Sequence, residues 1–341
     1  MKELIHAQKM IYPDLLEVMQ KRYSLLYTIF LFQPIGRRGL IEQTKLQERF
    51  IRNETELLKK QGLIEMTTKG MLITHTGEAI LKDLYMFNRE LLGVATLEHE
   101  LQSYIGDTKV IVVPGDSDQS EFVKHEIGRA TVDYLQKIIQ DDVTIAVTGG
   151  TTMAAVANAM VPFEGYECSF VPARGGVGEK VENQANSIVA KMAKAEQGNY
   201  HLLHVPDPLS ETLYQTIIHE PQIKETLNII KNTDIVIHGI GEALAMASRR
   251  KTSQRVMDKL IKDKAVSEAF GYYFDITGQI VHKVRTVGIQ LEDLTHINQV
   301  ITVAGGKSKA QAILSYMIHG KSDVLVTDEA AALEIINLYK N

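Results

Sequence analysis

The chain has 341 residues, a length that favours two or three domains, and 45% of them are hydrophobic, as expected for a globular protein with a substantial core. No apolar run approaches the roughly 18 residues of a transmembrane helix, and the mixed charges of the N-terminal stretch MKELIHAQKMIYPD lack the apolar block of a signal peptide. The single cysteine, Cys168, excludes an intrachain disulfide framework and favours a reducing, cytoplasmic location.

The net charge of −5 is unevenly distributed along the chain. Residues 1–103 carry 14 basic and 13 acidic side chains, so the negative charge lies in the remainder. Within residues 21–53, seven basic side chains stand against two acidic ones. A basic patch on an acidic protein indicates a polyanionic partner for that segment, although a solvated helix face has the same composition.

Residues 1–75 have the element pattern of a winged helix-turn-helix. An apolar stripe predicts a first helix from Pro13 to Phe32, which a following Pro and Gly interrupt. Helical segments over 37–43 and 47–61 follow, and the runs LIEM and MLIT around the turn TTKG predict a small hairpin. This order of elements predicts a DNA-binding domain.

In this fold the third helix enters the major groove of DNA. Its exposed polar candidates are Gln47, Glu48, Arg49, Arg52, Asn53 and Thr55. Two arginines of the basic segment 21–53 also precede this helix, Arg37 and Arg38. We therefore assign the DNA contacts to Arg37, Arg38, Gln47, Arg49, Arg52 and Asn53.

A linker helix is predicted over residues 76–105. Apolar residues recur there in steps of mostly four and three, at Ile80, Leu84, Phe87, Leu91, Val94, Leu101 and Ile105. Such alternation describes a coiled-coil-like seam, interrupted by Glu98. We favour a linker that also self-associates; a helix docked on the larger domain is the alternative.

From residue 106 onward, short apolar runs alternate with helical segments. The runs are VIVV (110–113), VTIAV (143–147), CSFV (168–171), YHLLHV (200–205), DIVIHGIG (234–241), VITVAGG (300–306) and DVLVT (323–327). Unbroken apolar runs suit strands that are covered on both faces. They predict a doubly wound parallel α/β sheet, with ligands at the carboxyl ends of its strands and a β insertion over 271–287.

The stretch TIAVTGGTTMAAV (144–156) predicts a strand, a glycine turn and a helix with Thr151 and Thr152 at its mouth. The first N–H groups of a helix lack internal partners, and the helix dipole favours negative charge there. Because Gly149 and Gly150 let a ligand approach the backbone, the turn is a candidate phosphate seat. A βα turn with a capping threonine is the alternative, and the spacing of a nucleotide-hydrolysing P-loop is absent.

Two further strand ends support an anionic ligand. Gly305-Gly306 repeats the glycine turn and adds the lysines of KSK, and Arg174 follows a third strand with a guanidinium that grips phosphate. Gly239-Ile240-Gly241 resembles a dinucleotide fingerprint, but Leu244 occupies its third glycine position. The strand ends at Gly149-Gly150, Arg174 and Gly305-Gly306 therefore predict a small phosphorylated anion as the ligand. Neither a nicotinamide cofactor nor a metal site is expected.

Six long motifs stand out in the larger part of the chain: TGGTT (148–152), VPARGGVGEKVENQAN (171–186), HGIGEALAMASRR (238–250), SEAFGYYF (267–274), AGGKSKAQAI (304–313) and VLVTDEAA (324–331). Together with IHAQK, MQKR and PIGRR near the N-terminus, they closely resemble the SorC family of sugar-responsive bacterial repressors. Within that family they resemble the members that control central glycolytic genes in low-GC Gram-positive bacteria.

The resemblance implies a winged helix-turn-helix joined to a sensor domain that is similar to sugar-phosphate isomerases and glucosamine-6-phosphate deaminases. It also implies repression of an operon of central glycolytic enzymes, fructose-1,6-bisphosphate as the effector, and dimers that pair into tetramers on the operator. The segment TKLQERFIRNET departs from the family, because it lacks the Leu-Gly-Ile-Ser turn usual in such motifs. This departure leaves the operator sequence open.

The residues expected to contact the effector are Gly149, Gly150, Thr151, Thr152, Arg174, Gln184, Arg249, Glu268 and Lys309. The glycine turn and its threonines would hold one phosphate with the lysine nearby, and the two arginines would bind the second. The roles of Gln184 and Glu268, which would bind sugar hydroxyls, are implied by the resemblance alone.

We therefore expect a cytoplasmic transcriptional repressor with a DNA-binding domain (1–75), a linker helix (76–105) and an effector domain (106–341). Its expected partners are double-stranded operator DNA, a sugar phosphate and further copies of the chain, without a cofactor, a membrane or catalytic residues. The alternative is a sugar-phosphate isomerase or deaminase with an appended DNA-binding head. Glu242, Glu268 and Asp328 near strand ends leave acid/base chemistry open.

Overall fold

The computed structural model of the chain describes residues 10–91, 93–176, 180–207 and 209–340. It divides into two compact units, one of residues 1–96 with 120–122 and one of residues 97–119 with 123–341. None of the described helices is both long and apolar enough to cross a membrane.

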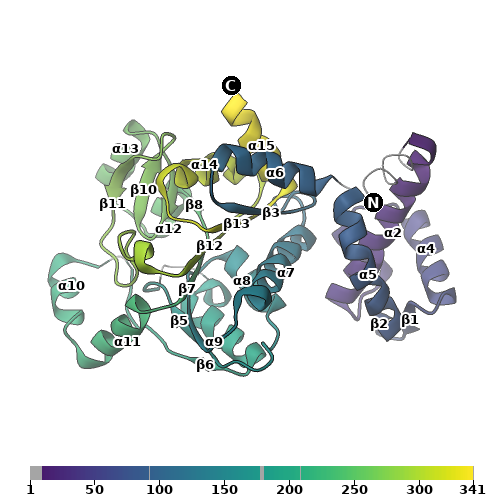
Figure 1. The fold of residues 1–341 in the computed structure, drawn as a ribbon, viewed down its shortest axis with the longest axis horizontal. Coiled ribbons are helices and arrows are strands. Elements are labelled where there is room, and N and C mark those ends of the chain that lie inside the picture. Colours follow the sequence, from purple (N-terminus) through teal and green to yellow (C-terminus); the bar gives the residue numbers. More distant parts are fainter. Residues whose placement is uncertain (1–9, 92, 177–179, 208, 341) are drawn as a thin grey trace. The chain divides into compact units, whose positions relative to one another are not determined.

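The smaller unit begins with three helices and an antiparallel hairpin (Figure 1). These elements are α2 (Pro13–Phe32), α3 (Arg37–Thr44), α4 (Glu48–Lys60), β1 (Ile64–Thr67) and β2 (Gly70–Ile73). Their apolar faces meet in one buried core, which includes Leu25, Ile29, Leu40, Ile51 and Leu58. The order and packing of these elements confirm the predicted winged helix-turn-helix.

Close backbone contact fixes the hairpin against the turn before α3. Ile35 N donates to Met71 O at 3.2 Å, and Met71 N donates to Ile35 O at 2.8 Å. At Gly70 φ is +142°, and a Cβ atom there would lie 2.9 Å from the Ile35 backbone. A glycine is therefore required at this position by both the backbone angle and the contact.

The larger unit is built on a seven-stranded sheet in which every neighbouring pair of strands is parallel. The strands are β3 (Lys109–Val113), β4 (Val143–Val147), β5 (Cys168–Pro172), β6 (Asn199–Tyr200), β7 (Ile235–His238), β12 (Gln299–Val303) and β13 (Val324–Asp328). Their spatial order is β3-β13-β12-β7-β4-β5-β6. This confirms the doubly wound sheet, although β6 is shorter than the predicted run 200–205.

The helices between these strands cover both faces of the sheet, as right-handed crossovers require (Figure 1). One face carries α7 (Glu121–Ile138), α8 (Thr151–Ala159) and α9 (Ala185–Glu196), and the other carries α11 (Pro221–Lys231) and α14 (Ala310–His319). The remaining helical elements are α10 (Glu211–Ile217), α15 (Glu329–Lys340) and short 3₁₀ turns at Val181–Asn183, Asp293–His296 and Lys307–Lys309. The direction of winding reverses between β4 and β7, where ligands bind in folds of this class.

A four-stranded antiparallel sheet is inserted between β7 and β12. It comprises β8 (Gly241–Glu242), β9 (Ala265–Ala269), β10 (Tyr272–Asp275) and β11 (Ile280–Lys283), with α12 (Ala243–Arg249) and α13 (Gln254–Lys262) after its first strand. Ala247, Leu260 and Tyr273 contribute to its small core. The sequence predicted this insertion over 271–287, but it already begins at Gly241.

The stretch predicted as one linker helix is two helices, α5 (His75–Leu91) and α6 (Val94–Ile105). Gly93 between them has a left-handed φ of +71°, which ends a helix rather than continuing it. The prediction of a single helix over 76–105 is therefore wrong. Two residues of the predicted seam lie outside the side chains that the structure describes, Phe87 and Leu91.

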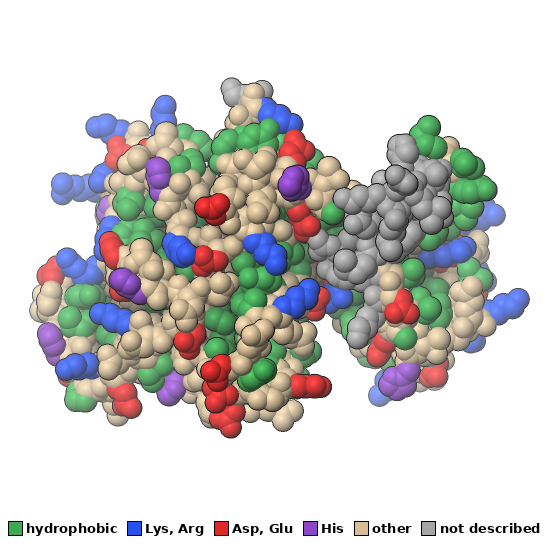
Figure 2. Space-filling view, in the orientation of Figure 1, with side chains coloured by type: hydrophobic (Ala, Val, Ile, Leu, Met, Phe, Trp, Pro, Cys, Tyr) green, Lys and Arg blue, Asp and Glu red, His purple; other side chains and the backbone are tan. Residues whose placement is uncertain are grey.

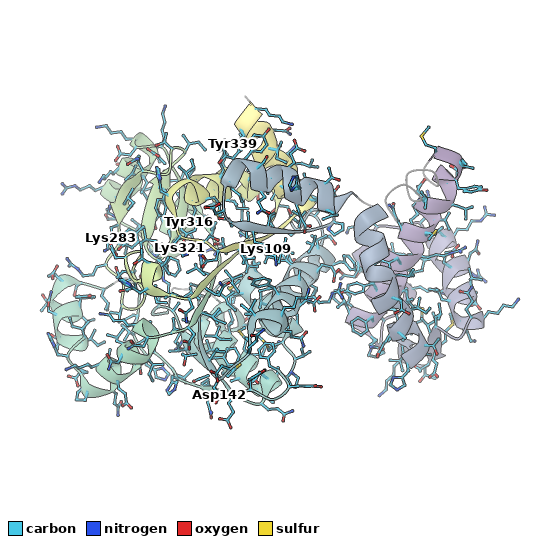
Figure 3. All side chains as sticks on the ribbon, in the orientation of Figure 1. Lys109, Asp142, Lys283, Tyr316, Lys321 and Tyr339 are labelled. Atoms are coloured by element: carbon cyan, nitrogen blue, oxygen red, sulfur yellow. The ribbon has the colours of Figure 1, made fainter. Side chains whose placement is uncertain are left out.

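From Leu97 onward, α6 belongs to the larger unit and packs against it. Tyr104 stacks on Tyr339 of α15 with ring centroids 5.1 Å apart. Tyr339 is labelled in Figure 3. Glu98, which interrupts the apolar series, accepts a hydrogen bond from Val112 N of the edge strand β3 at 2.8 Å. The sequence left a helix docked on the larger domain as the alternative to a self-associating linker. For α6, the structure contains this docked helix.

The core of the larger unit contains a buried histidine. The His238 ring meets Tyr316 of α14 edge-on, with centroids 5.1 Å apart, and its Nε2 lies 2.9 Å from Thr302 Oγ1. Burial lowers the pKa of His238 to about 4. The imidazole is therefore neutral at pH 7 and serves as a packed polar core residue.

Candidate anion-binding pocket and nucleic-acid interface

A pocket lies in the crevice where the winding of the sheet reverses, at the carboxyl ends of β4, β5, β7 and β12. The nine predicted effector residues all line it: Gly149, Gly150, Thr151, Thr152, Arg174, Gln184, Arg249, Glu268 and Lys309. They come from separate segments, which the parallel sheet and its insertion bring to one concave site. Polar groups that converge in a cleft are the usual arrangement of a small-molecule site.

The turn between β4 and α8 presents an open helix N-terminus to the pocket. Gly150 occupies the N-cap with φ +120°, and no described group accepts a hydrogen bond from the N–H groups of Thr151 and Thr152. A Cβ atom at Gly149 would lie 2.8 Å from Asn183 O, so the two loops pack closely because a glycine is present. Backbone donors at a helix N-terminus are suited to an anion.

The floor of the pocket is a buried pair of opposite charges. Arg174 and Glu268 are 6% and 3% exposed, and Arg174 Nη1 donates to Glu268 Oε1 at 3.0 Å. Arg174 Nε donates to Asp207 Oδ2 at 3.0 Å. Burial opposes ionisation of Glu268, but Arg250 and Arg174 outweigh it and hold the pKa of this carboxyl at about 2. Two carboxylates thus offset the charge of Arg174, which the sequence assigned to phosphate.

The AGGKSK loop differs from its sequence prediction. We expected a second open anion seat there, but internal carboxylates occupy its backbone donors. Gly306 N donates to Asp328 Oδ2, and Ser308 N donates to Asp118 Oδ2, both at 2.7 Å. Asp118 belongs to the loop that follows β3, which no local pattern places beside this turn. The prediction of a second open backbone seat is therefore wrong.

The AGGKSK loop nevertheless contributes one cation to the pocket. Lys309 lines it, and burial together with the nearby Arg249 lowers the pKa of this lysine. Lys307 is exposed, with its Nζ 3.5 Å from Glu334 Oε2, and does not line the pocket. Arg249 is exposed at the end of α12. Two cations from different segments therefore accompany the open end of α8.

Several lining residues had little or no signal in the sequence. Gln184 lies at the N-cap of α9 and was found through the family resemblance alone. Glu242 caps α12 by accepting two backbone hydrogen bonds, at 3.0 and 3.2 Å, and Met246 and Phe270 supply apolar wall. Residues 239–241 also line the pocket, although their pattern indicated only an incomplete dinucleotide fingerprint.

The smaller unit exposes the predicted DNA contacts. Four of them lie at or near the start of α4 and are exposed: Gln47, Arg49, Arg52 and Asn53. Lys and Arg side chains (blue) are visible over this helix in Figure 2. Arg38 on α3 is exposed as well, and Arg37 lies with its Nη2 3.3 Å from Glu56 Oε1. A surface ion pair of this kind contributes little energy, so it leaves the arginine available.

Thr55 is a correction to the candidate DNA contacts. Its side chain is fully buried, and its Oγ1 donates to Ile51 O at 2.8 Å. Ile51, Thr55 and Leu58 form the buried face of α4, at helical spacing. The periodicity of the helix thus assigns Thr55 to the core, whatever its polarity.

Among the described residues, no group of three His, Cys, Asp or Glu side chains is placed to hold a metal ion. Cys168 is buried in β5, and burial raises the pKa of its thiol to about 12. The thiol is therefore protonated at pH 7 and packs as a small apolar side chain.

Two family models match the chain. The model described as "Putative sugar-binding domain" matches residues 89–337, and the model of the CggR N-terminal DNA binding domain matches residues 18–87. Both matches agree with the element order of the structure. They support a DNA-binding head joined to a domain for a sugar-type ligand.

Two curated relatives match nearly the whole chain and share one name. The "Central glycolytic genes regulator" of Priestia megaterium is 50% identical over 338 residues, covering 98% of this chain and 99% of the relative. The protein of that name from Bacillus subtilis is 48% identical, with coverage of 98% and 99%.

Solved structures show the same fold. The "putative SorC family transcriptional regulator from Enterococcus faecalis" is 45% identical at a TM-score of 0.67 and covers 71% of this chain and 99% of its own. The full-length sorbitol operon regulator SorC from Klebsiella pneumoniae is 17% identical at a TM-score of 0.67, with coverage of 95% and 99%. The second likeness supports the fold alone.

Proposed function

We propose a function from the premise that this chain belongs to the SorC family of transcriptional regulators, among its central glycolytic genes regulators. It is a DNA-binding regulator, and we propose that it represses an operon of central glycolytic genes from the cytoplasm. A phosphorylated sugar in the pocket releases or remodels it on the operator. Fructose-1,6-bisphosphate is the proposed effector.

The observation that carries this proposal is the open N-terminus of α8 at the sheet crevice, with cations beside it. A phosphate there accepts hydrogen bonds from the backbone N–H groups of Thr151 and Thr152 and from the hydroxyl of Thr152. Arg249 and Lys309 come from other segments of the pocket and support a second phosphate. The positive charge needed for a doubly phosphorylated ligand is therefore present at one site.

The pocket also suits the hydroxyl groups of a sugar. Gln184 offers both donors and an acceptor, and Glu268 offers an ionised carboxylate at the floor. An ionised carboxylate accepts hydrogen bonds from hydroxyl groups but repels phosphate. The mixture favours a ligand with anionic ends and a neutral polyol part.

Glu268 and His238 are ill suited to the proton transfer that an isomerase or deaminase needs. A general base works best with a pKa near the operating pH. Glu268 has a pKa of about 2 and already accepts three hydrogen bonds on one oxygen. His238 has a pKa of about 4 and does not line the pocket. Neither group is poised for proton transfer at pH 7.

Calorimetric titration of the full-length protein with fructose-1,6-bisphosphate, fructose-6-phosphate and fructose tests the proposal. We expect the bisphosphate to bind most tightly and unphosphorylated fructose not to bind measurably. Equal affinity for fructose and its bisphosphate would contradict phosphate recognition. Product formation from fructose-6-phosphate or glucosamine-6-phosphate at high protein concentration would favour the enzyme alternative.

A further inference from the structure

Four charged side chains form a buried cluster at and behind the floor of the pocket: Arg174, Asp207, Arg250 and Glu268. Each is at most 6% exposed. They come from the end of β5, the loop before α10, the end of α12 and strand β9. This charge cluster contains two cations and two anions, so its formal charges cancel. Arg174 and Glu268 line the pocket, whereas the other two lie behind them.

The two oxygens of the Glu268 carboxylate have different surroundings. Oε1 accepts from Arg250 Nη2 at 2.8 Å, Arg174 Nη1 at 3.0 Å and Gly271 N at 2.6 Å. Oε2 accepts from no described group, and a Cβ atom at Gly241 on the pocket wall would lie 3.4 Å from it. One oxygen is therefore saturated by the protein, and the other is left for a ligand.

Arg250 fixes this arrangement without reaching the pocket. Its Nη1 donates to Tyr273 Oη at 2.8 Å, and its Nη2 donates to Glu268. Its Nε lies 3.7 Å from Asp207 Oδ1, and neither atom has a hydrogen-bond partner among the described residues. The guanidinium is thus held by Tyr273 and Glu268, and its charge favours the ionised form of that carboxylate.

We infer that Arg250 is a positioning residue of the effector site: it orients the Glu268 carboxylate so that Oε2 is left to bind a ligand hydroxyl. The inference rests on the proposed function and deepens it. Phosphate is recognised at the mouth of α8, and the polyol part is recognised at the floor through a residue that the ligand never touches. The pocket therefore selects a phosphorylated polyol over a phosphate anion that lacks hydroxyl groups.

The test compares two probes, fructose-1,6-bisphosphate and inorganic phosphate, by calorimetry on the full-length protein. In Arg250→Met, Glu268 loses a cation and an orienting donor. Because a hydrogen bond to a charged group is at stake, we expect about 10-fold or more loss of bisphosphate affinity. Inorganic phosphate, which uses the mouth of α8, should bind within twofold of the parent. Arg250→Lys keeps the charge and should recover part of the bisphosphate affinity.

The pH profile separates positioning from a merely structural role. Loss of the Arg250 charge raises the pKa of Glu268, so the affinity of Arg250→Met should fall further below the parent as the pH decreases from 8 to 5. The ligand titrates in the same way in both experiments, so the ratio of the variant's affinity to the parent's affinity at each pH removes its effect. Arg129→Met removes an ion pair with Glu126 on α7 and is the matched control. Its affinities for the bisphosphate and for inorganic phosphate should not change. Thermal melts establish that each variant is folded.

Tyr273→Phe is a milder variant in case Arg250→Met does not fold. It removes the hydroxyl that holds Arg250 Nη1 and should weaken the bisphosphate several-fold, again without a change for inorganic phosphate. Folded variants that bind the bisphosphate like the parent, or that lose both probes equally, would overturn the inference. If the parent binds another phosphorylated sugar instead, the proposed effector fails and the same comparison with that sugar tests Arg250. If the parent binds no phosphorylated sugar, both the proposed function and the role of Arg250 are overturned.

Discussion

At the scale of single residues, the proposed recognition of the effector is divided between backbone donors and buried side chains. Thr152 lies at the open end of α8, only 9% exposed, where its hydroxyl can join the backbone N–H groups. Glu268 lies at the floor of the pocket, held by two arginines. The two residues therefore have opposite electrostatic surroundings within one site.

Thr152→Val should weaken fructose-1,6-bisphosphate about 10- to 150-fold, because a hydrogen bond to a charged group contributes roughly 1.5–3 kcal/mol. Valine keeps the shape of the side chain and removes only the hydroxyl. Isothermal titration measures the change, and Thr226→Val on α11 is the control for the same substitution elsewhere. Affinity within twofold of the parent would remove Thr152 from the site.

His238 should make the stability of the larger unit depend on pH. Its pKa is lowered by burial from 6.5 to about 4, so the unfolded chain binds a proton in this window that the folded chain does not. This contribution to stability is fully present above pH 6.5. The free energy of unfolding should fall by about 3 kcal/mol as the pH falls to 4. Urea unfolding at a series of pH values measures this loss.

His238→Gln cannot take up the proton and should lose less stability across the same window, although it is less stable at pH 7. The exposed His204→Gln is the control and should leave the slope unchanged. Parallel pH profiles for the parent and His238→Gln would show that another group causes the dependence.

At the scale of elements, local patterns predicted the strands and one of the pocket loops, but not the contacts between distant segments. The strands and the open turn before α8 followed from apolar runs and paired glycines, which depend on neighbouring residues alone. The AGGKSK turn has the same local pattern, yet Asp118 from a distant loop fills it. The break at Gly93 lies inside an apolar repeat that continues across it. Arg250 meets Glu268 through the inserted sheet, and Asp207 meets Arg174 from the loop before α10, so no spacing in the sequence could identify either contact.

Helix α4 should be the element that reads operator DNA. Arg52→Ala removes a cation and should reduce the salt dependence of operator binding by about one unit of slope. Asn53→Ala should cost about 1–3 kcal/mol of discrimination if the amide contacts a base. Operator affinity over a range of salt concentrations measures both effects.

Lys59→Ala removes a charge from the last turn of the same helix and is the matched control, with a smaller effect expected. Thermal melts confirm that the variants are folded, as their exposed positions predict. Folded Arg52→Ala and Asn53→Ala proteins that bind operator like the parent would show that another face of the head contacts DNA.

At the scale of the whole molecule, the proposed effector and DNA sites belong to different compact units. Every lining residue of the pocket lies at or after Thr148, whereas the predicted DNA contacts end at Asn53. We therefore propose that the effector acts on DNA binding through assembly or conformation. We propose that dimers pair into tetramers on the operator and that the effector favours an arrangement with lower DNA affinity, since equal affinity for both arrangements would shift nothing.

The most direct test of this account is an operator titration with and without saturating fructose-1,6-bisphosphate, with the assembly state followed by sedimentation. A coupling of about 1–3 kcal/mol predicts operator binding 5- to 150-fold weaker with effector, and by linkage the operator should weaken effector binding by the same factor. The sedimentation profile on DNA should change with the effector. Identical operator affinity and identical assembly in both titrations would contradict the account.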